Sequence, residues 1–205
     1  IGLLTNITRL RVTNNRLTSL PMELGNLCNM TELAVSDNEL RELPALGHLT
    51  ALRTLLVANN PLKLPPDRII RKGTFAIVNY LRVLFEAGGA PAEIVERGRP
   101  SVEAFHQTFQ QGVAANNLSL RARLLEQVPT QVRDILTLTT LNLECNLIEN
   151  LDDAGLGNLV NLHTLKLSYN QIPSFPREFA RLTCLTNLEA KYNFLAAIPS
   201  SICGL

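Results

Sequence analysis

The chain has no tryptophan, only 5% aromatic residues, and a net charge of +1 over 205 residues. A chain so close to neutral has no long-range field that would gather nucleic acid or an anionic membrane surface. No apolar run approaches the roughly 18 residues that a membrane-spanning helix needs. We therefore expect a partner that is neither a nucleic acid nor a membrane.

Motifs for small-molecule chemistry are missing as well. The sequence contains no phosphate-binding loop, no dinucleotide glycine pattern and no paired metal-ligand spacing, so we expect no cofactor, metal or small-molecule substrate. Cys145, His163 and Glu144 are expected to lie near one another on one face of the folded chain. A cysteine beside a histidine is the minimum for nucleophilic catalysis. However, no helix amino terminus or glycine-rich turn accompanies Cys145 to form an oxyanion site. We expect that the protein is not an enzyme.

The cysteines lack both the clustering of a disulfide cap and the spacing of a zinc site. They lie far apart in the sequence, as Cys28, Cys145, Cys184 and Cys203. This scatter predicts reduced thiols and a cytoplasmic protein. Three glycosylation-type triplets, beginning at Asn6, Asn29 and Asn117, favour a secreted chain as the alternative. Repeats rich in Asn, Leu and Thr also generate such triplets by chance.

Leucine, in contrast, is plentiful and regularly spaced. If Leu162 is counted as position 1, apolar residues occupy positions 1, 4, 6, 11, 14, 18 and 21, with Asn at position 9 and Pro at position 15. The same spacing recurs on both sides at intervals of 22 to 24 residues. A period of this length indicates a solenoid of stacked coils.

Within one coil, Leu165-Lys166-Leu167 alternates apolar and polar residues, which predicts a short strand with one buried face. The Asn at position 9 can bond the open backbone groups of neighbouring coils. No coil buries its leucines alone, so stability must come from stacking. Strands are predicted at Leu10–Val12, Leu33–Val35, Leu55–Val57, Leu118–Leu120, Leu141–Leu143, Leu165–Leu167 and Leu188–Ala190.

The period fails between residues 67 and 114, where helical spacing replaces leucine spacing. Thr74 is expected to cap a helix that runs to about Ala87, and a second helix is expected from Val102 to Val113. The exposed turn predicted between them is at Gly88-Gly89. We therefore predict a first array at 1–66, a helical insert at 67–114 and a second array at 115–205. Both ends fall inside a coil, so capping repeats or partners are expected beyond them.

With Pro at position 15 and a spacing near 23 residues, the coils resemble the intracellular leucine-rich repeat class of Ras-pathway scaffold proteins and their plant relatives. The segment NPLKLPPDRIIRKGTFAIVNYLR, residues 60–82, looks like the helical segment that ends or interrupts arrays in that class. The resemblance implies an α/β solenoid with a parallel inner sheet and an irregular or helical outer face. It also implies a non-catalytic binding scaffold, whose partner is a protein such as a small GTPase or a regulator.

Side chains at positions 2, 3, 5, 7 and 8 are expected to line the inner surface, and the second array is the richer in polar and aromatic groups. Tyrosine and arginine are favoured at binding hot spots. The predicted partner-binding residues are Arg121, Asn142, Glu144, His163, Lys166, Tyr169, Glu189, Lys191 and Tyr192. The plainer alternative is a solvated sheet face with charge pairs such as Glu144 with Lys166. A fixed structural subunit of a large assembly is the alternative function, and the sequence does not separate it from a scaffold.

Overall fold

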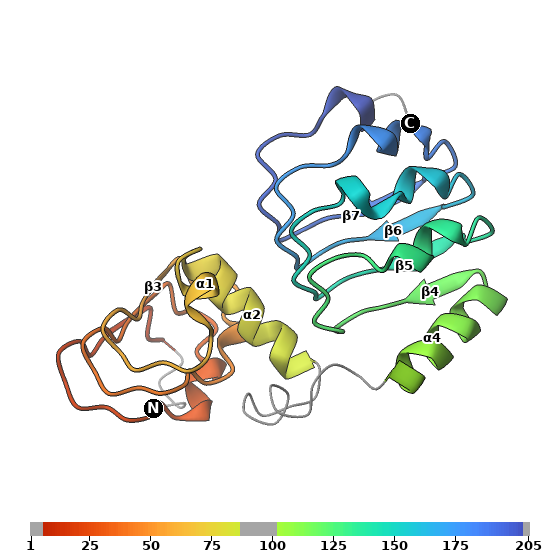
Figure 1. Ribbon diagram of the computed structural model, residues 1–205. Helices are drawn as coiled ribbons and strands as arrows, with labels where there is room; N and C mark the ends of the chain where they lie inside the picture. The colour runs from red at the N-terminus through yellow and green to blue at the C-terminus, as the bar shows by residue number, and fades with distance from the viewer. Residues whose placement is uncertain (1–5, 87–101, 203–205) are drawn as a thin grey trace. The chain divides into compact units, whose positions relative to one another are not determined.

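The computed structural model describes residues 6–86 and 102–202, and the chain forms two compact units, residues 1–96 and 97–205. Each unit is a stack of coils in which every coil contributes one short strand to a parallel sheet (Figure 1). The solenoid predicted from the leucine spacing is confirmed. The predicted boundaries near residues 67 and 115 stay a prediction.

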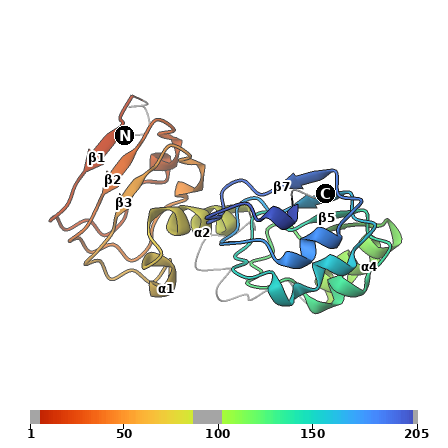
Figure 2. The same cartoon turned by 90° about the horizontal axis from the view of Figure 1, so that it is seen from above.

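The first unit has a three-stranded sheet in the order β1-β2-β3, whose strands lie side by side in Figure 2. Short 3-10 turns return the chain on the outer side, and two helices follow the last strand. The elements are β1 (Arg9–Arg11), η1 (Met22–Asn26), β2 (Glu32–Ala34), η2 (Leu46–His48), β3 (Thr54–Leu56), α1 (Asp67–Ile70) and α2 (Thr74–Glu86).

The second unit begins with a helix and continues with a four-stranded sheet in the order β4-β5-β6-β7. Its outer side again consists of 3-10 turns. The elements are α4 (Val102–Ala114), β4 (Asn117–Ser119), η3 (Thr130–Asp134), β5 (Thr140–Asn142), η4 (Asp152–Ala154), η5 (Leu156–Asn158), β6 (Thr164–Lys166), η6 (Arg177–Arg181), β7 (Asn187–Glu189) and η7 (Ser200–Ile202).

All seven predicted strands are present, and each begins and ends one residue earlier than predicted. The prediction took the apolar residues at positions 4 and 6 as strand limits. In the structure, pairing already starts at position 3, because the position-2 carbonyl of one coil accepts from two amides of the next. The Thr8 carbonyl, for example, accepts from the amides of Thr31 and Glu32 at 2.7 and 3.1 Å.

The position-9 asparagines connect the coils. The Asn170 amide group donates to the carbonyl of Leu167 in its own coil at 3.0 Å and to that of Leu143 in the preceding coil at 2.9 Å. Its side-chain oxygen accepts from the Ile148 amide at 3.1 Å. Asn170 is 0% exposed, so these bonds are made out of water. The equivalent asparagines, Asn38, Asn60, Asn146 and Asn193, repeat the pattern.

Helix α2 closes the first array. Thr74 begins the helix as expected, but its hydroxyl accepts from the Leu55 amide of β3 at 2.8 Å, so it serves the edge of the sheet. The helix lies so close to η2 that a Cβ added at Gly47 would be 2.5 Å from the Arg82 Cα. Ile77, Leu81 and Leu84 are buried, which confirms that this helix packs on its array.

The remaining parts of the predicted insert are an exposed ring at Phe85 and parts that lie outside the described residues. Phe85 is 51% exposed and makes an edge-on contact with the ring of His48, with centroids 5.0 Å apart. The predicted turn at Gly88-Gly89, the Phe105 side chain and the helix end at Ala87 lie outside the described residues.

Helix α4 opens the second array and packs on β4. A Cβ at Gly112 would be 2.6 Å from the Leu118 Cδ1, so glycine permits this close approach. Arg123 stands at position 9 of this first coil, where Asn is expected. Since a helix precedes the coil, the backward bonds of a ladder asparagine have no preceding strand to reach. The Arg123 guanidinium instead donates to the Thr108 hydroxyl of α4 at 3.3 Å, and its backbone amide donates to Asn146.

Replacing Leu165 with Ala is expected to lower the free energy of unfolding by about 2 to 5 kcal/mol, because the removed side chain is 0% exposed and leaves a cavity. The matched control is Leu136→Ala, since Leu136 is 55% exposed, and its effect should stay within about 0.5 kcal/mol. Denaturant titrations of the variants measure both. Equal effects would mean that Leu165 is not in the core.

Replacing Asn170 with Ala is expected to cost about 1 to 3 kcal/mol, since it leaves the buried Ile148 amide without its acceptor and removes one donor from each of the Leu143 and Leu167 carbonyls. Asn15→Ala is the control, because Asn15 is exposed and its amide group, among the residues that the structure describes, bonds the carbonyls of Val12 and Thr13 in its own coil. Thermal melts should show a clear loss for Asn170 and a small one for Asn15. A melt of Asn170→Ala that matches the wild type would refute the role of the ladder.

Candidate functional site

The inner surface of β4–β7 is built in rows. The strands pair in register, with Leu118, Leu141, Leu165 and Leu188 opposite one another, so residues with the same position number lie next to each other on adjacent strands. Because position 4 points into the core, the polar side chains at positions 5 and 7 face outward on the other side of the sheet. Most of the predicted site residues lie in these rows or beside them.

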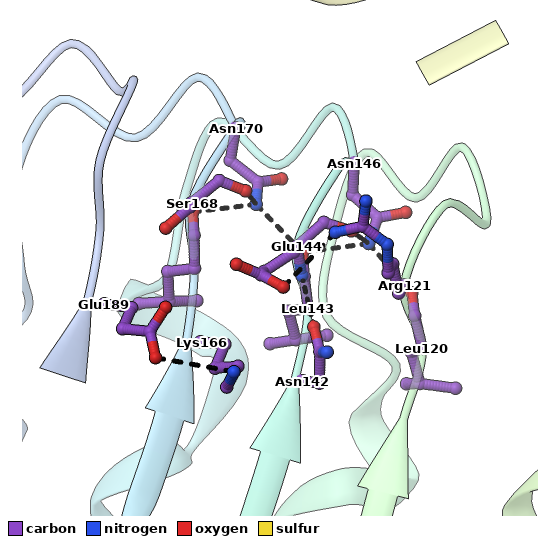
Figure 3. A network of polar contacts seen from close by, with 11 residues as sticks. Leu120, Arg121, Asn142, Leu143, Glu144, Asn146, Lys166, Ser168, Asn170 and Glu189 are labelled. Carbon is purple, nitrogen blue, oxygen red and sulfur yellow. Dashed lines mark hydrogen bonds and ion pairs between the residues drawn. The ribbon is translucent and has the colours of Figure 1, made fainter. Parts of the chain in front are cut away.

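Two ion pairs join adjacent strands in these rows (Figure 3). At position 7, Arg121 Nη1 lies 3.2 Å from Glu144 Oε2. At position 5, Lys166 Nζ lies 3.4 Å from Glu189 Oε1. The expected pair of Glu144 with Lys166 is therefore wrong, because these two residues belong to different rows and each has a closer partner in its own row.

Neighbouring groups fix the backbone at Glu144 and favour the charged form of Glu189. The Asn142 side-chain oxygen accepts from the Glu144 amide at 2.9 Å and so fixes the backbone beneath that carboxylate. The pKa of Glu189 is lowered, first by a hydrogen bond from the Asn187 amide group and then by Lys166 and Lys191. The polar part of the surface is thus ordered before any partner arrives.

The position-8 residues have an unusual backbone. Each lies in the left-handed region, with φ between 53° and 59°, in all seven coils of the described chain. The first array fills this position with Asn14, Asp37 and Asn59, residue types that tolerate such a conformation. The last two coils fill it with Tyr169 and Tyr192. A large side chain in this conformation costs about 1 to 2 kcal/mol.

The rings of Tyr169 and Tyr192 are stacked, with centroids 4.6 Å apart and planes 10° from parallel. Tyr192 is 44% exposed. A stack of this kind returns about 0.5 to 1.5 kcal/mol, which does not cover the backbone cost of both residues. The two tyrosines are therefore poorly explained as stabilising elements of the fold.

Cys145 and His163 lie at different depths in the second array. Cys145 is 0% exposed, so its expected place on the open face is wrong. It occupies position 8 like the tyrosines and shares their left-handed backbone. His163 lies at position 2, where its Nδ1 is 2.8 Å from the Asn161 carbonyl oxygen. Within the described residues, no group of acids, histidines and cysteines could hold a metal ion.

Ser168 was missed by the sequence analysis. It lies at position 7 between Glu144 and Lys191, is 2% exposed, and its hydroxyl has no hydrogen-bond partner. A buried polar group without a partner costs free energy and is uncommon in folded proteins. Its place in the row next to Glu144 and Lys191 was the available signal, since position 7 is among the expected inner-surface positions of every coil.

Comparison with known families agrees with this architecture. The family model described as leucine rich repeat matches residues 5–62 and 137–195, which is more than half of the chain. The chain belongs to the leucine-rich repeat family. Domains of this family generally mediate protein–protein interactions and are generally not enzymes. Among the described residues, no helix is long and apolar enough to cross a membrane.

Several solved structures are similar over most of this chain. A leucine-rich repeat protein of Leptospira interrogans has 24% identity over 100% of this chain and 48% of its own, with a TM-score of 0.42. Internalin C2 of Listeria monocytogenes has 24% identity over 97% and 69%, with a TM-score of 0.39. A plant peptide hormone receptor has 20% identity over 98% and 23%, with a TM-score of 0.35. The chain thus spans about half the length of the Leptospira protein.

Replacing Tyr169 and Tyr192 with Asn, the residue type that Asn14 and Asn59 supply at position 8 of their coils, is expected to change the free energy of unfolding by no more than about 1 kcal/mol. The relieved backbone offsets the lost stack. The matched control replaces both with Ala, which loses the stack but does not share Asn's preference for positive φ. The Asn variant should therefore melt at the higher temperature. An Ala variant that is equally stable or more stable would contradict the cost assigned to these positions.

Proposed function

We propose that this chain is a non-catalytic scaffold whose second array binds a partner protein on its inner surface. The observation that carries the proposal is the parallel stack of Tyr169 and Tyr192, held in a backbone conformation that opposes large side chains. The fold forms this backbone with Asn, Asp, Ala or Cys in the other coils, so it does not require tyrosine there. A strained residue that the fold does not require is typical of a functional position. Tyrosine also combines a large contact area with a hydroxyl, which suits a binding hot spot.

The surface around the stack supports the proposal because it is preorganised. Two ion pairs hold four of its charged side chains, and the rings hold each other. Little side-chain freedom is then lost on association, so more of the contact energy appears as affinity. The proposed contact residues are Arg121, Asn142, Glu144, His163, Lys166, Tyr169, Glu189, Lys191 and Tyr192.

We propose that the scaffold lies in the cytoplasm and belongs to the leucine-rich repeat class of Ras-pathway scaffold proteins and their plant relatives. Its proposed partner is a small GTPase or a regulator. Support comes from the proline at position 15 and from the helical residues 67–86 that follow the first array. Cys28 and Cys184 are exposed and not in disulfides, which fits a reducing compartment.

The four lysines of the chain allow a direct test. Lys166 and Lys191 lie on the proposed surface, whereas Lys63 and Lys72 lie in the first unit. Amine-reactive crosslinking of the native protein in cell extract, followed by mass spectrometry, is expected to join the partner to Lys191 and Lys166. Crosslinks found only at Lys63 and Lys72 would place the contact elsewhere and overturn the proposal.

The partner identified by crosslinking should bind the Y169N/Y192N variant more weakly by at least about 2 kcal/mol, as expected when hot-spot side chains are removed. Titration calorimetry with the purified partner measures this loss. A scaffold should also exchange bound for free partner, whereas a structural subunit should be recovered only inside its assembly. Unchanged affinity would exclude the tyrosine stack from the interface.

A further inference from the structure

The charges on the inner surface of the second array do not cancel. Arg121 is paired with Glu144, and Lys166 is paired with Glu189. Lys191, at position 7 of the last strand's coil, is exposed and has no ion pair within the described residues. Its charge helps to lower the pKa of Glu189, but that carboxylate already binds Lys166. One cation next to the tyrosine stack is therefore left for a partner.

A second group beside it also lacks a partner. The Ser168 hydroxyl is buried and makes no hydrogen bond. The Tyr169 amide donates to the Lys191 carbonyl at 2.9 Å, so the coils that carry Ser168 and Lys191 are adjacent and the two residues are neighbours in the position-7 row. An ammonium and a hydroxyl are both hydrogen-bond donors. The exposed Lys191 ammonium is the one of the two that a negatively charged acceptor on a partner can reach, because the Ser168 hydroxyl is buried.

The tyrosine stack borders the same place. Tyr169 follows Ser168 in sequence, and Tyr192 follows Lys191 and is 44% exposed. Aromatic side chains pack well on flat rings, and such a contact contributes beyond the area that it buries. The surface thus offers an apolar ring wall directly beside the exposed Lys191 ammonium.

We propose that the partner presents a short segment in which an aspartate or glutamate binds Lys191, and an adjacent aromatic or proline ring packs against Tyr192. This inference rests on the proposed function and specifies the chemistry of the segment that the surface recognises. A basic segment is disfavoured because Glu144 and Glu189 already have cations, so an added cation would meet Lys191 without a counter-charge.

Peptide display tests this chemistry without knowledge of the natural partner. A phage library of random short peptides is selected on the whole wild-type chain and depleted on the Y169N/Y192N variant, which removes peptides that bind elsewhere. The enriched sequences are expected to carry Asp or Glu next to an aromatic residue or proline. Enrichment of basic or uncharged sequences, or no enrichment at all, would overturn the inference.

Direct binding then tests Lys191 and the carboxylate of the peptide. A synthetic peptide of the most enriched sequence should bind Lys191→Glu at least about tenfold more weakly than wild type, as for a lost charge-assisted contact. It should also weaken when its own Asp or Glu is changed to Asn or Gln. The matched control is Lys63→Glu, a charge reversal at an exposed lysine of the first unit, which should bind as wild type does.

These results separate the inference from the proposed function. If native crosslinks fall on Lys166 and Lys191 but Lys191→Glu binds the peptide normally, the surface is an interface and the carboxylate is wrong. If crosslinks fall only on the first unit, the interface itself is wrong. Acidic peptides that lose affinity for Lys191→Glu and not for Lys63→Glu support the inference.

Discussion

The hydrogen bonds of the buried asparagines to the preceding coil are the constraint on which the rest of this structure depends. Asn146 and Asn170 each bond the backbone of two coils while fully buried. An unsatisfied backbone group at this depth would cost free energy, so the coils can stack in only one register. That register sets the leucines in rows on one face of the sheet and the charged and aromatic side chains in rows on the other.

The sequence was informative where spacing reports burial. Apolar residues at positions 4 and 6 predicted every strand to within one residue. Apolar spacing predicted helices from Thr74 to about Ala87 and from Val102 to Val113, where the structure has α2 and α4. Spacing does not report the backbone conformation at position 8, because Asn, Asp, Ala, Cys and Tyr all occur there. It also does not give the depth of a side chain, which is why Cys145 was misplaced.

The pairing of charges failed for a related reason. Glu144 and Lys166 are on adjacent strands, and the sequence alone makes either a straight or a diagonal partner reasonable. The in-register sheet favours partners within a row, so Arg121 binds Glu144 and Glu189 binds Lys166. Arg123 differs from the asparagine pattern because its coil follows a helix. These details depend on which neighbour a coil has, and a repeat pattern carries no such information.

The two helices that border the arrays also affect how molecules of this protein meet each other. An open sheet edge presents unpaired backbone groups and can pair with a strand of another copy, which leads to aggregation. On β3, the Leu55 amide is already bonded to the Thr74 hydroxyl of the segment that begins α2. On β4, α4 packs so closely that a Cβ added at Gly112 would be 2.6 Å from Leu118 Cδ1. These two edges are thereby protected from strand addition, which favours solubility in a chain rich in short parallel strands.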